Sequence, residues 1–289
     1  MAGCARCGAG VTLPLLSDEQ LGPLYPSGYG PHVADRMILP LRIISWAIRS
    51  RQARAAWRDR PVRALHSRPP GRGLDVGCGR GDLDVMLAGH GWRMAGIEPS
   101  PEACATAAAR GVDARCGTLA SVELEPEAYD AIIFRHSLEH SNDPVGDLVR
   151  VARALAPGGV VLVSVPNFGC WQARRLGGHW YHLDLPRHRT HFTDRSLRLA
   201  FSRAGLECTE LGTTTSTLGL PGSIQYRLFG RWLFRGALSL RVSTGLASLT
   251  RPLARLLNRL SGGGDELQAV ARRAIASSTS SATASAGPG

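Results

Sequence analysis

The chain has 289 residues, of which 44% are hydrophobic, so it is long enough for one large globular domain or two small ones. It contains no run of 18 or more uncharged apolar residues and no apolar stretch behind a basic start, which predicts neither a membrane-spanning helix nor a secretory leader. The formal net charge is +11, but all 34 basic residues are arginine, a bias typical of codon usage, so we use the positions of the arginines rather than their number.

The first 66 residues precede the main domain. Residues 1–34 are rich in Pro and Gly and predict an irregular segment, and residues 35–66 predict a basic helix. Cys4 and Cys7 have the C-x-x-C spacing of half a zinc site, but no second C-x-x-C pair follows. We therefore expect a flexible tail with two thiols, and a bound metal is the alternative. Without an export signal, all seven cysteines are expected to be reduced.

Strand and helix patterns alternate from the breaker "SRPPGRG" (67–73) to Pro166. Apolar runs predict strands, and amphipathic or capped segments between them predict helices, one of which begins at Ser100 and stops at Gly111. The expected strands are 74–76, 93–98, 112–116, 129–134 and 160–165, and the expected helices are 82–88, 100–111 and 143–155. This order predicts an α/β fold: a doubly wound, mostly parallel sheet with helices on both faces.

The alternation stops after residue 166. Residues 167–193 are rich in histidine and aromatic residues, and 194–206 predict a helix capped by Thr193 or Asp194. We expect a strand at 207–215, a basic amphipathic helical insertion at 217–264 and a last strand at 265–273. The small, polar residues 274–289 predict a disordered tail.

The stretch "LDVGCGRGD" (74–82) predicts a ligand-binding turn. Alternate glycines after a strand allow close approach to the backbone, at a helix start whose N–H groups are free. Asp75, two positions before Gly77, suits a cation such as a sulfonium better than a pyrophosphate. Glu98 ends the next strand, where a carboxylate can accept hydrogen bonds from both ribose hydroxyls.

On the basis of these residues, the stretch from about residue 70 to residue 170 resembles the class I S-adenosylmethionine-dependent methyltransferases. "LDVGCGRGDL" matches the family's first motif, "GIEPS" its ribose-binding acid, "YDAIIFRHSLEHSNDP" its fourth strand and "LAPGGVVLVSVPN" its fifth. The resemblance implies a Rossmann-like, seven-stranded sheet with an antiparallel last strand, here with helical additions at both ends. It also implies methyl transfer from S-adenosylmethionine.

The resemblance also implies roles for individual positions. Carried over to this chain, the cofactor-binding residues are Asp75, Gly77, Cys78 and Gly79 at the methionine part, Gly81 for close helix packing, Glu98 and Pro99 at the ribose, Gly117 and Thr118 near the adenine, and Arg135 and His136 beside the cofactor. Many relatives place an acid near the adenine where this chain reads "CGTL", so backbone groups are expected to replace that contact.

Six of the nine histidines fall between 136 and 191. The segment "LGGHWYHLDLPRHRTHF" resembles one found in quinone-type and cell-surface-pathway methyltransferases, where it covers the active site, so 167–193 is expected to be a lid. Three interpretations stay open: His140 or His188 as a general base, a metal site, or polar residues that organise the lid. The metal set would be His182, Asp184, His188 and His191; it fits no standard zinc pattern, and we predict no metal. Asp184 and Arg187 form either a structural pair or a substrate clamp.

Arginines at four-residue spacing mark the predicted C-terminal helices. They are Arg227, Arg231 and Arg235, and then Arg251, Arg255 and Arg259, each set interleaved with large apolar residues. Residues 217–261 therefore either contact a membrane surface or pack their apolar sides internally, and the same choice holds for 41–57. Nucleic acid is disfavoured as a partner, because aromatic stacking platforms are missing.

The predicted function is methyl transfer from S-adenosylmethionine to a small-molecule or lipid-linked acceptor, at oxygen. The alternatives are a non-catalytic nucleoside-binding protein of the same fold and an RNA methyltransferase. The expected location is cytoplasmic, with peripheral contact at the inner membrane face.

Overall fold

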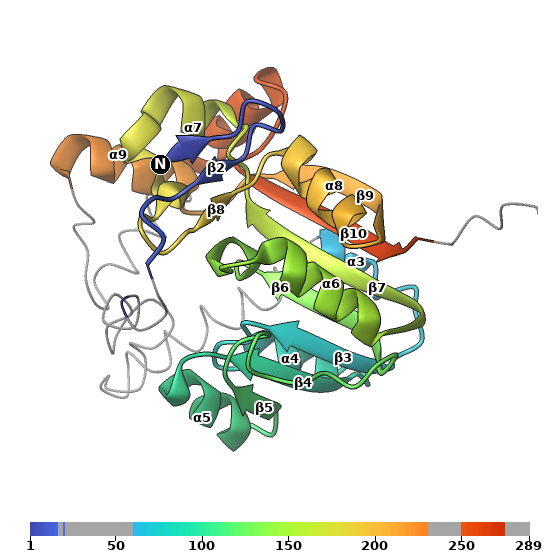
Figure 1. Ribbon diagram of the computed structural model, residues 1–289. Coiled ribbons are helices and arrows are strands. Elements are labelled where there is room, and N and C mark those ends of the chain that lie inside the picture. Colours follow the sequence, from blue (N-terminus) through green and yellow to red (C-terminus); the bar gives the residue numbers. More distant parts are fainter. Residues whose placement is uncertain (17–19, 21–59, 231–249, 275–289) are drawn as a thin grey trace, which may run out of the picture.

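A computed structural model describes residues 1–16, 20, 60–230 and 250–274. Its centre is a seven-stranded sheet in the order β5-β4-β3-β6-β7-β10-β9 (Figure 1). The strands are β3 (Arg72–Val76), β4 (Arg93–Glu98), β5 (Asp113–Cys116), β6 (Tyr129–Arg135), β7 (Leu155–Pro166), β9 (Leu206–Thr214) and β10 (Glu266–Arg273). Strands β3 to β7 pair in parallel, whereas β10 runs antiparallel to both β7 and β9. The predicted Rossmann-like sheet with an antiparallel last strand is confirmed.

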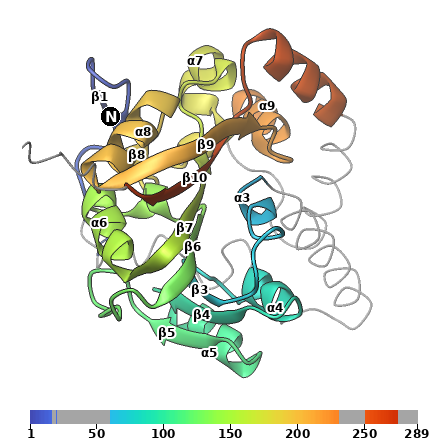
Figure 2. The ribbon, with the colours of Figure 1, turned by 90° about the vertical axis from the view of Figure 1, so that its right-hand side faces the viewer.

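Helices cover both faces of this sheet. In Figure 2, α6 (Pro144–Ala154) and α8 (Asp194–Arg203) lie on one side, while α3 (Arg60–Arg63) and α4 (Asp82–Ala88) lie on the other. The continuous apolar runs of the strands follow from this burial on two sides. Alternate residues of β6 show it: Ile132 belongs to the core under α6 and α8, and Ile133 to the core under α3 and α4.

Side-chain caps set the helix starts. The Ser100 side chain accepts a hydrogen bond from the backbone of Ala103 at the start of α5 (Pro101–Ala109). Asp143 does the same for α6, through Gly146. Thr193, rather than Asp194, caps α8, and it forms a reciprocal capping box with Ser196.

The N-terminal segment is ordered where the sequence predicted irregular chain. Strands β1 (Ala2–Gly3) and β2 (Gly10–Val11) pair with each other, and β2 pairs with β8 (Thr190–His191). The prediction was wrong for these residues, because the strands are only two residues long and β2 pairs with a strand about 180 positions away. The helix expected at 35–66 lies outside the described residues up to 59, as does the tail from 275.

The segments predicted as a lid (167–193) and as a helical insertion (217–264) contain short helices where the structure describes them; we keep the name lid for 167–193. The lid holds α7 (Trp171–Leu176) and the 3₁₀ turns Gly177–His179 and Tyr181–Leu183, and α9 (Gly219–Phe229) and a helix at 250–260 follow in the chain. Residues 231–249 of the insertion lie outside the described part. None of the helices described, here or elsewhere, combines the length and apolar content needed to cross a bilayer. The domain boundaries drawn from the sequence stay a prediction.

Candidate active site

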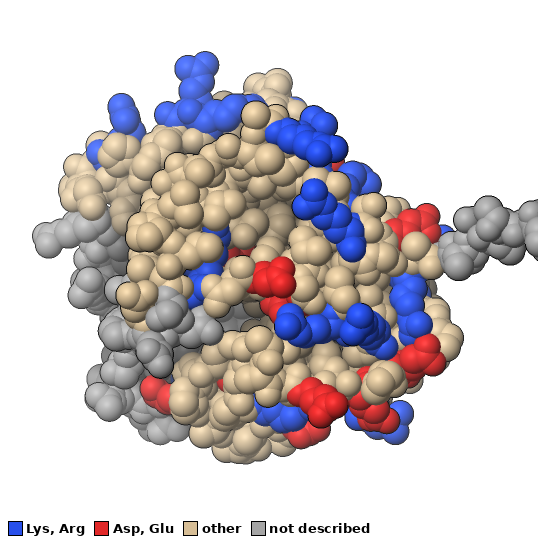
Figure 3. Space-filling view, viewed as in Figure 1, with Lys and Arg blue, Asp and Glu red and all other residues tan. Residues whose placement is uncertain are grey.

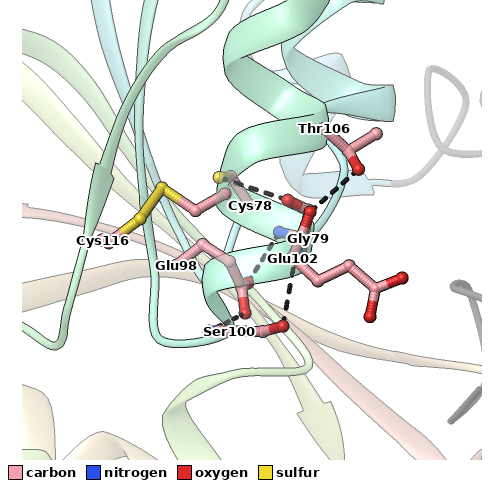
Figure 4. The surroundings of a disulfide bond; sticks show 9 residues. Cys78, Gly79, Glu98, Ser100, Glu102, Thr106 and Cys116 are labelled. Atoms are coloured by element: carbon pink, nitrogen blue, oxygen red, sulfur yellow. Dashed lines mark hydrogen bonds between the residues drawn. A yellow bond between two sulfur atoms is a disulfide. The ribbon is translucent and has the colours of Figure 1, made fainter. Parts of the chain in front are cut away.

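The carboxyl ends of β3 and β4 bring the glycine turn and Glu98 together. Glu98 accepts two backbone hydrogen bonds, from Gly79 to Oε2 and from Ser100 to Oε1, both at 2.9 Å (Figure 4). The backbone of Gly77 donates to the carbonyl of Ile97 at 2.8 Å. These bonds hold the carboxylate in one orientation, with 9% of the residue exposed. The sequence did not assign the Ser100 amide to the site, although its cap position was recognised.

The glycines of the turn serve two purposes. A Cβ at Gly81 would lie 2.7 Å from Val112 Cγ2, so this residue lets α4 pack closely against the neighbouring segment. A Cβ at Gly79 would meet no heavy atom within 4 Å, and its φ of +56° is a conformation that side chains disfavour. The space beside Gly79 is therefore open to a ligand.

Asp75 is a buried carboxylate that lacks part of its hydrogen bonding. The residue is 3% exposed, and no hydrogen bond reaches Oδ1. Burial raises the pKa of Asp75 to about 7; Arg135 opposes that shift and Glu98 adds to it. An unsatisfied buried acceptor beside an open glycine turn fits a cationic ligand, because a positive group there would stabilise the ionised form. S-adenosylmethionine carries such groups, so these residues fit the cofactor.

A disulfide joins Cys104 in α5 to Cys116 at the end of β5, with Cα atoms 5.8 Å apart (Figure 4). The expectation that all cysteines are reduced was wrong for this pair, because packing of α5 on β5 decides the contact rather than spacing in the sequence. Cys116 is the sheet partner of Glu98. The disulfide therefore fixes the wall beside the ribose-binding candidate. Cys78 is buried nearby as a free thiol.

The segment after β5 lies against Glu98. The Gly117 amide donates to the Glu98 carbonyl at 3.1 Å, and the Thr118 amide donates to Ser121 Oγ at 2.9 Å. Thr118 and Pro99 are both exposed. Backbone and hydroxyl groups thus line the region where the resemblance placed the adenine.

His136 follows β6 with a left-handed φ of 56° and lies between two carboxylates. Its Nδ1 is 3.5 Å from Glu139 Oε1, and its Nε2 is 3.5 Å from Glu266 Oε1. Burial would lower the pKa of His136, but the two carboxylates, Glu266 foremost, raise it to about 10. His136 is therefore a cation at neutral pH. The sequence named His136 and missed both acids; Glu266 arrives from the last strand through pairing with Pro166.

The structure places the two candidate bases together. The rings of His140 and His188 are 4.7 Å apart and meet edge to face. Burial lowers the pKa of His188 to about 4, although the carboxylate of Glu139 acts in the opposite direction. His188 is therefore neutral at physiological pH.

The other residues of the metal set considered from the sequence do not converge. His182 Nε2 faces Ser216 Oγ at 3.1 Å and Asp265 Oδ2 at 3.3 Å. His191 Nε2 faces Thr12 Oγ1 at 3.0 Å. Asp184 forms an ion pair with Arg187 within the lid. Of that set, only His188 lies beside His140.

The region that contains Asp75, the glycine turn and Glu98 lies within the range matched by a known family. The sequence model of a family described as "Methyltransferase domain" matches residues 49–211, more than half of the chain. The chain belongs to the methyltransferase-domain family. The predictions that it is a class I methyltransferase, an enzyme that uses S-adenosylmethionine, are confirmed.

Curated relatives match a shorter region. A ubiquinone biosynthesis O-methyltransferase of Burkholderia vietnamiensis is 34% identical over 103 residues, 33% of this chain and 44% of that protein. The enzyme of the same name from Nitrobacter winogradskyi is 32% identical over 166 residues, 53% of this chain and 62% of that protein. The matches thus span about half the length of these relatives.

Solved structures share the fold. A methyltransferase from Archaeoglobus fulgidus superposes with a TM-score of 0.53 at 16% identity, covering 77% of this chain and 93% of that one. One from Mesorhizobium loti gives 0.50 at 19% identity, covering 73% and 95%. At these identities the likeness extends to the fold alone.

Proposed function

We propose that the protein transfers a methyl group from S-adenosylmethionine to an oxygen atom of a small-molecule acceptor. The pairing of Asp75 and Glu98 around the open turn at Gly79 carries the cofactor part of this proposal. The oxygen acceptor is supported by the curated O-methyltransferases to which part of this chain is similar.

The cofactor supplies a methyl group on a sulfonium, a strong electrophile, so the protein mainly has to align the reacting atoms. Glu98, held by the amides of Gly79 and Ser100, accepts hydrogen bonds from the ribose hydroxyls. Asp75 offers a carboxylate to the positive end of the ligand. The acceptor hydroxyl attacks the methyl carbon, the carbon–sulfur bond breaks with its electrons on sulfur, and the hydroxyl proton leaves.

His140 and His188 are the candidates for taking that proton. His140 follows the carboxyl end of β6, and His188 lies beside it. Both are at the edge of the sheet where the parallel strands end, as are the glycine turn and Glu98. Because its pKa is lowered to about 4, neutral His188 is available as an acceptor but is a weak base.

The function is tested with deuterated-methyl S-adenosylmethionine and a panel of phenols, catechols and hydroxyquinones. The expected result is release of S-adenosylhomocysteine together with an acceptor whose mass rises by one labelled methyl group at oxygen. Cofactor binding without product from any acceptor would instead support the non-catalytic alternative. Strongly salt-dependent RNA binding with RNA methylation would support the other one.

We further propose that the acceptor is lipid-linked and that 217–261 contacts an anionic membrane surface. The helix at 250–260 leaves Leu253, Leu256 and Leu260 exposed by 53%, 53% and 76%, and Arg255 and Arg259 are exposed among them. Basic side chains also gather along the upper edge of the molecule in Figure 3, where α7 and α9 lie in Figure 1. Exposed leucines interleaved with arginines favour an interfacial helix.

Sedimentation with vesicles tests this surface. The chain should sediment with phosphatidylglycerol vesicles and remain free with phosphatidylcholine vesicles. The combined changes Leu253→Ser, Leu256→Ser and Leu260→Ser should abolish the binding, whereas Leu185→Ser, at an exposed leucine of the lid, should not. Equal binding by the triple variant and the wild type would refute the membrane contact.

A further inference from the structure

Three side chains with metal-binding atoms meet beyond the end of β6. Glu139 and His140 belong to the 3₁₀ turn Leu138–His140, and His188 belongs to the lid. One ligand atom from each lies within 4.8 Å of the other two. The Arg189 amide donates to the Glu139 carbonyl at 2.8 Å, so a backbone hydrogen bond holds the two segments together at the cluster.

Both imidazoles are oriented by carbonyl groups behind them. His140 Nδ1 faces the Arg187 carbonyl at 3.0 Å, and His188 Nδ1 faces the His182 carbonyl at 2.8 Å. A carbonyl only accepts hydrogen bonds, so each Nδ1 carries the proton and each Nε2 carries the lone pair. His188 Nε2 lies 3.9 Å from Glu139 Oε1. This pattern of a backbone acceptor behind each ring is the one that orients histidine ligands in metal sites.

Glu139 supplies an independent observation. It is 1% exposed, and no hydrogen bond reaches either of its carboxylate oxygens. A buried carboxyl group without hydrogen bonds needs a compensating partner.

The charges around Glu139 leave room for a cation. The His136 ring is shared between Glu139 and Glu266, and it lies 3.5 Å from each. One imidazole ring thus faces two carboxyl groups. The acid next to His188, Asp184, is already paired with Arg187.

We propose that Glu139, His140 and His188 bind a divalent transition-metal cation of the zinc type. Two imidazoles and one carboxylate match the donor set of catalytic zinc sites, and they leave at least one coordination position open. We do not expect the site to prefer Mg²⁺ or Ca²⁺ over Zn²⁺, because those two ions favour oxygen donors.

The site lies beside the cofactor turn. Ser137, two residues before Glu139, is so close to the turn that a Cβ on Gly77 would lie 2.6 Å from its own Cβ. On the basis of the proposed function, a cation at this place would lower the pKa of an acceptor hydroxyl bound beside it. With a cation bound there, His140 and His188 hold it through Nε2, and the proton of the acceptor hydroxyl passes to water.

The test measures metal binding without any acceptor. Untagged full-length chain carrying Cys4→Ser and Cys7→Ser, which removes the thiol pair at the N-terminus, is stripped with chelator and titrated with Zn²⁺ and with Mg²⁺ by calorimetry. We expect one equivalent of Zn²⁺, with Mg²⁺ much weaker. Loaded with Co²⁺, the protein should show a visible spectrum without the charge-transfer band of thiolate ligands.

Variants identify the ligands. His188→Ala and Glu139→Gln should each weaken Zn²⁺ binding on the order of a hundredfold or more. His179→Ala, a change at an exposed histidine of the same lid, should leave it unchanged. His140→Ala, at a half-buried position, keeps the test valid if the two buried changes impair folding. Wild-type affinity no greater than that of His188→Ala would overturn the proposal.

Cofactor binding measured on the same samples separates this proposal from the proposed function. A protein that binds S-adenosylmethionine but no Zn²⁺ would overturn the metal site and leave methyl transfer standing. A protein that binds Zn²⁺ but no S-adenosylmethionine would overturn methyl transfer and leave the metal site standing.

Discussion

Glu98→Gln tests whether the carboxylate at the end of β4 holds the cofactor. In the wild type the two oxygens of Glu98 already accept the amides of Gly79 and Ser100, each at 2.9 Å. A glutamine has one oxygen, so its NH₂ group would face one of these N–H donors. The ribose hydroxyls would then face a neutral amide in place of an anion, and its NH₂ group cannot accept their hydrogen bonds.

The magnitude follows from the bonds lost. Hydrogen bonds to charged groups contribute about 1.5–3 kcal/mol and neutral ones about 1 kcal/mol, so weakening two ribose bonds costs about 3 kcal/mol in binding free energy. That corresponds to a dissociation constant raised on the order of a hundredfold. Titration calorimetry with S-adenosylhomocysteine measures the effect directly.

The matched control is Glu102→Gln. Glu102 lies in the first turn of α5, only four residues away, and its side chain is exposed. This variant should bind as the wild type does. An affinity of Glu98→Gln within about twofold of the wild type, in a variant whose thermal unfolding is unchanged, would refute our assignment of the ribose site.

Three further predictions concern the cofactor turn and its surroundings. Gly79 and Gly111 both have left-handed φ values, and a Cβ at either position would meet no heavy atom within 4 Å. Alanine should therefore destabilise the fold by about 1–2 kcal/mol at either position, through backbone strain alone. Only Gly79→Ala should also weaken cofactor affinity, by about tenfold or more in calorimetry, and Gly111→Ala is the control. Because the pKa of Asp75 is raised to about 7, its ionisation destabilises the ligand-free fold as pH rises from about 4 to 7, and a cationic ligand favours the ionised form. Affinity for S-adenosylmethionine should therefore increase as pH is raised through 7 and become flat in Asp75→Asn; an unchanged slope in that variant would contradict the mechanism. Reduction of Cys104–Cys116 should lower the free energy of unfolding by about 3 kcal/mol in urea titrations, and a reductant should have no further effect on Cys104→Ser.

The sequence predicted those parts of the fold that depend on local signals. The helix 82–88 and the strand 93–98 agree with α4 and β4, because glycines and a compact apolar run mark their limits. Glu98 and the glycine turn were recognised because a family motif spans neighbouring residues.

Parts that depend on distant contacts were missed. The disulfide requires α5 to pack on β5, and Glu266 reaches His136 only through the antiparallel pairing of β10 with β7. The convergence of Glu139 with His188 requires the lid to fold back over the sheet. No periodicity in the sequence reports such contacts, because each depends on how the elements pack against one another in the folded chain.

Residues near the amino terminus form part of the wall behind the histidine cluster. Thr12 donates its hydroxyl to the His188 carbonyl at 2.6 Å and its amide to the Arg189 carbonyl at 2.9 Å. The position of His188 thus depends on residues that precede the methyltransferase domain in the chain. Proteolytic trimming of this end, or an affinity tag fused there, would disturb the lid while sparing the Rossmann-like sheet. Preparations for kinetic work should therefore carry their tags at the carboxyl terminus.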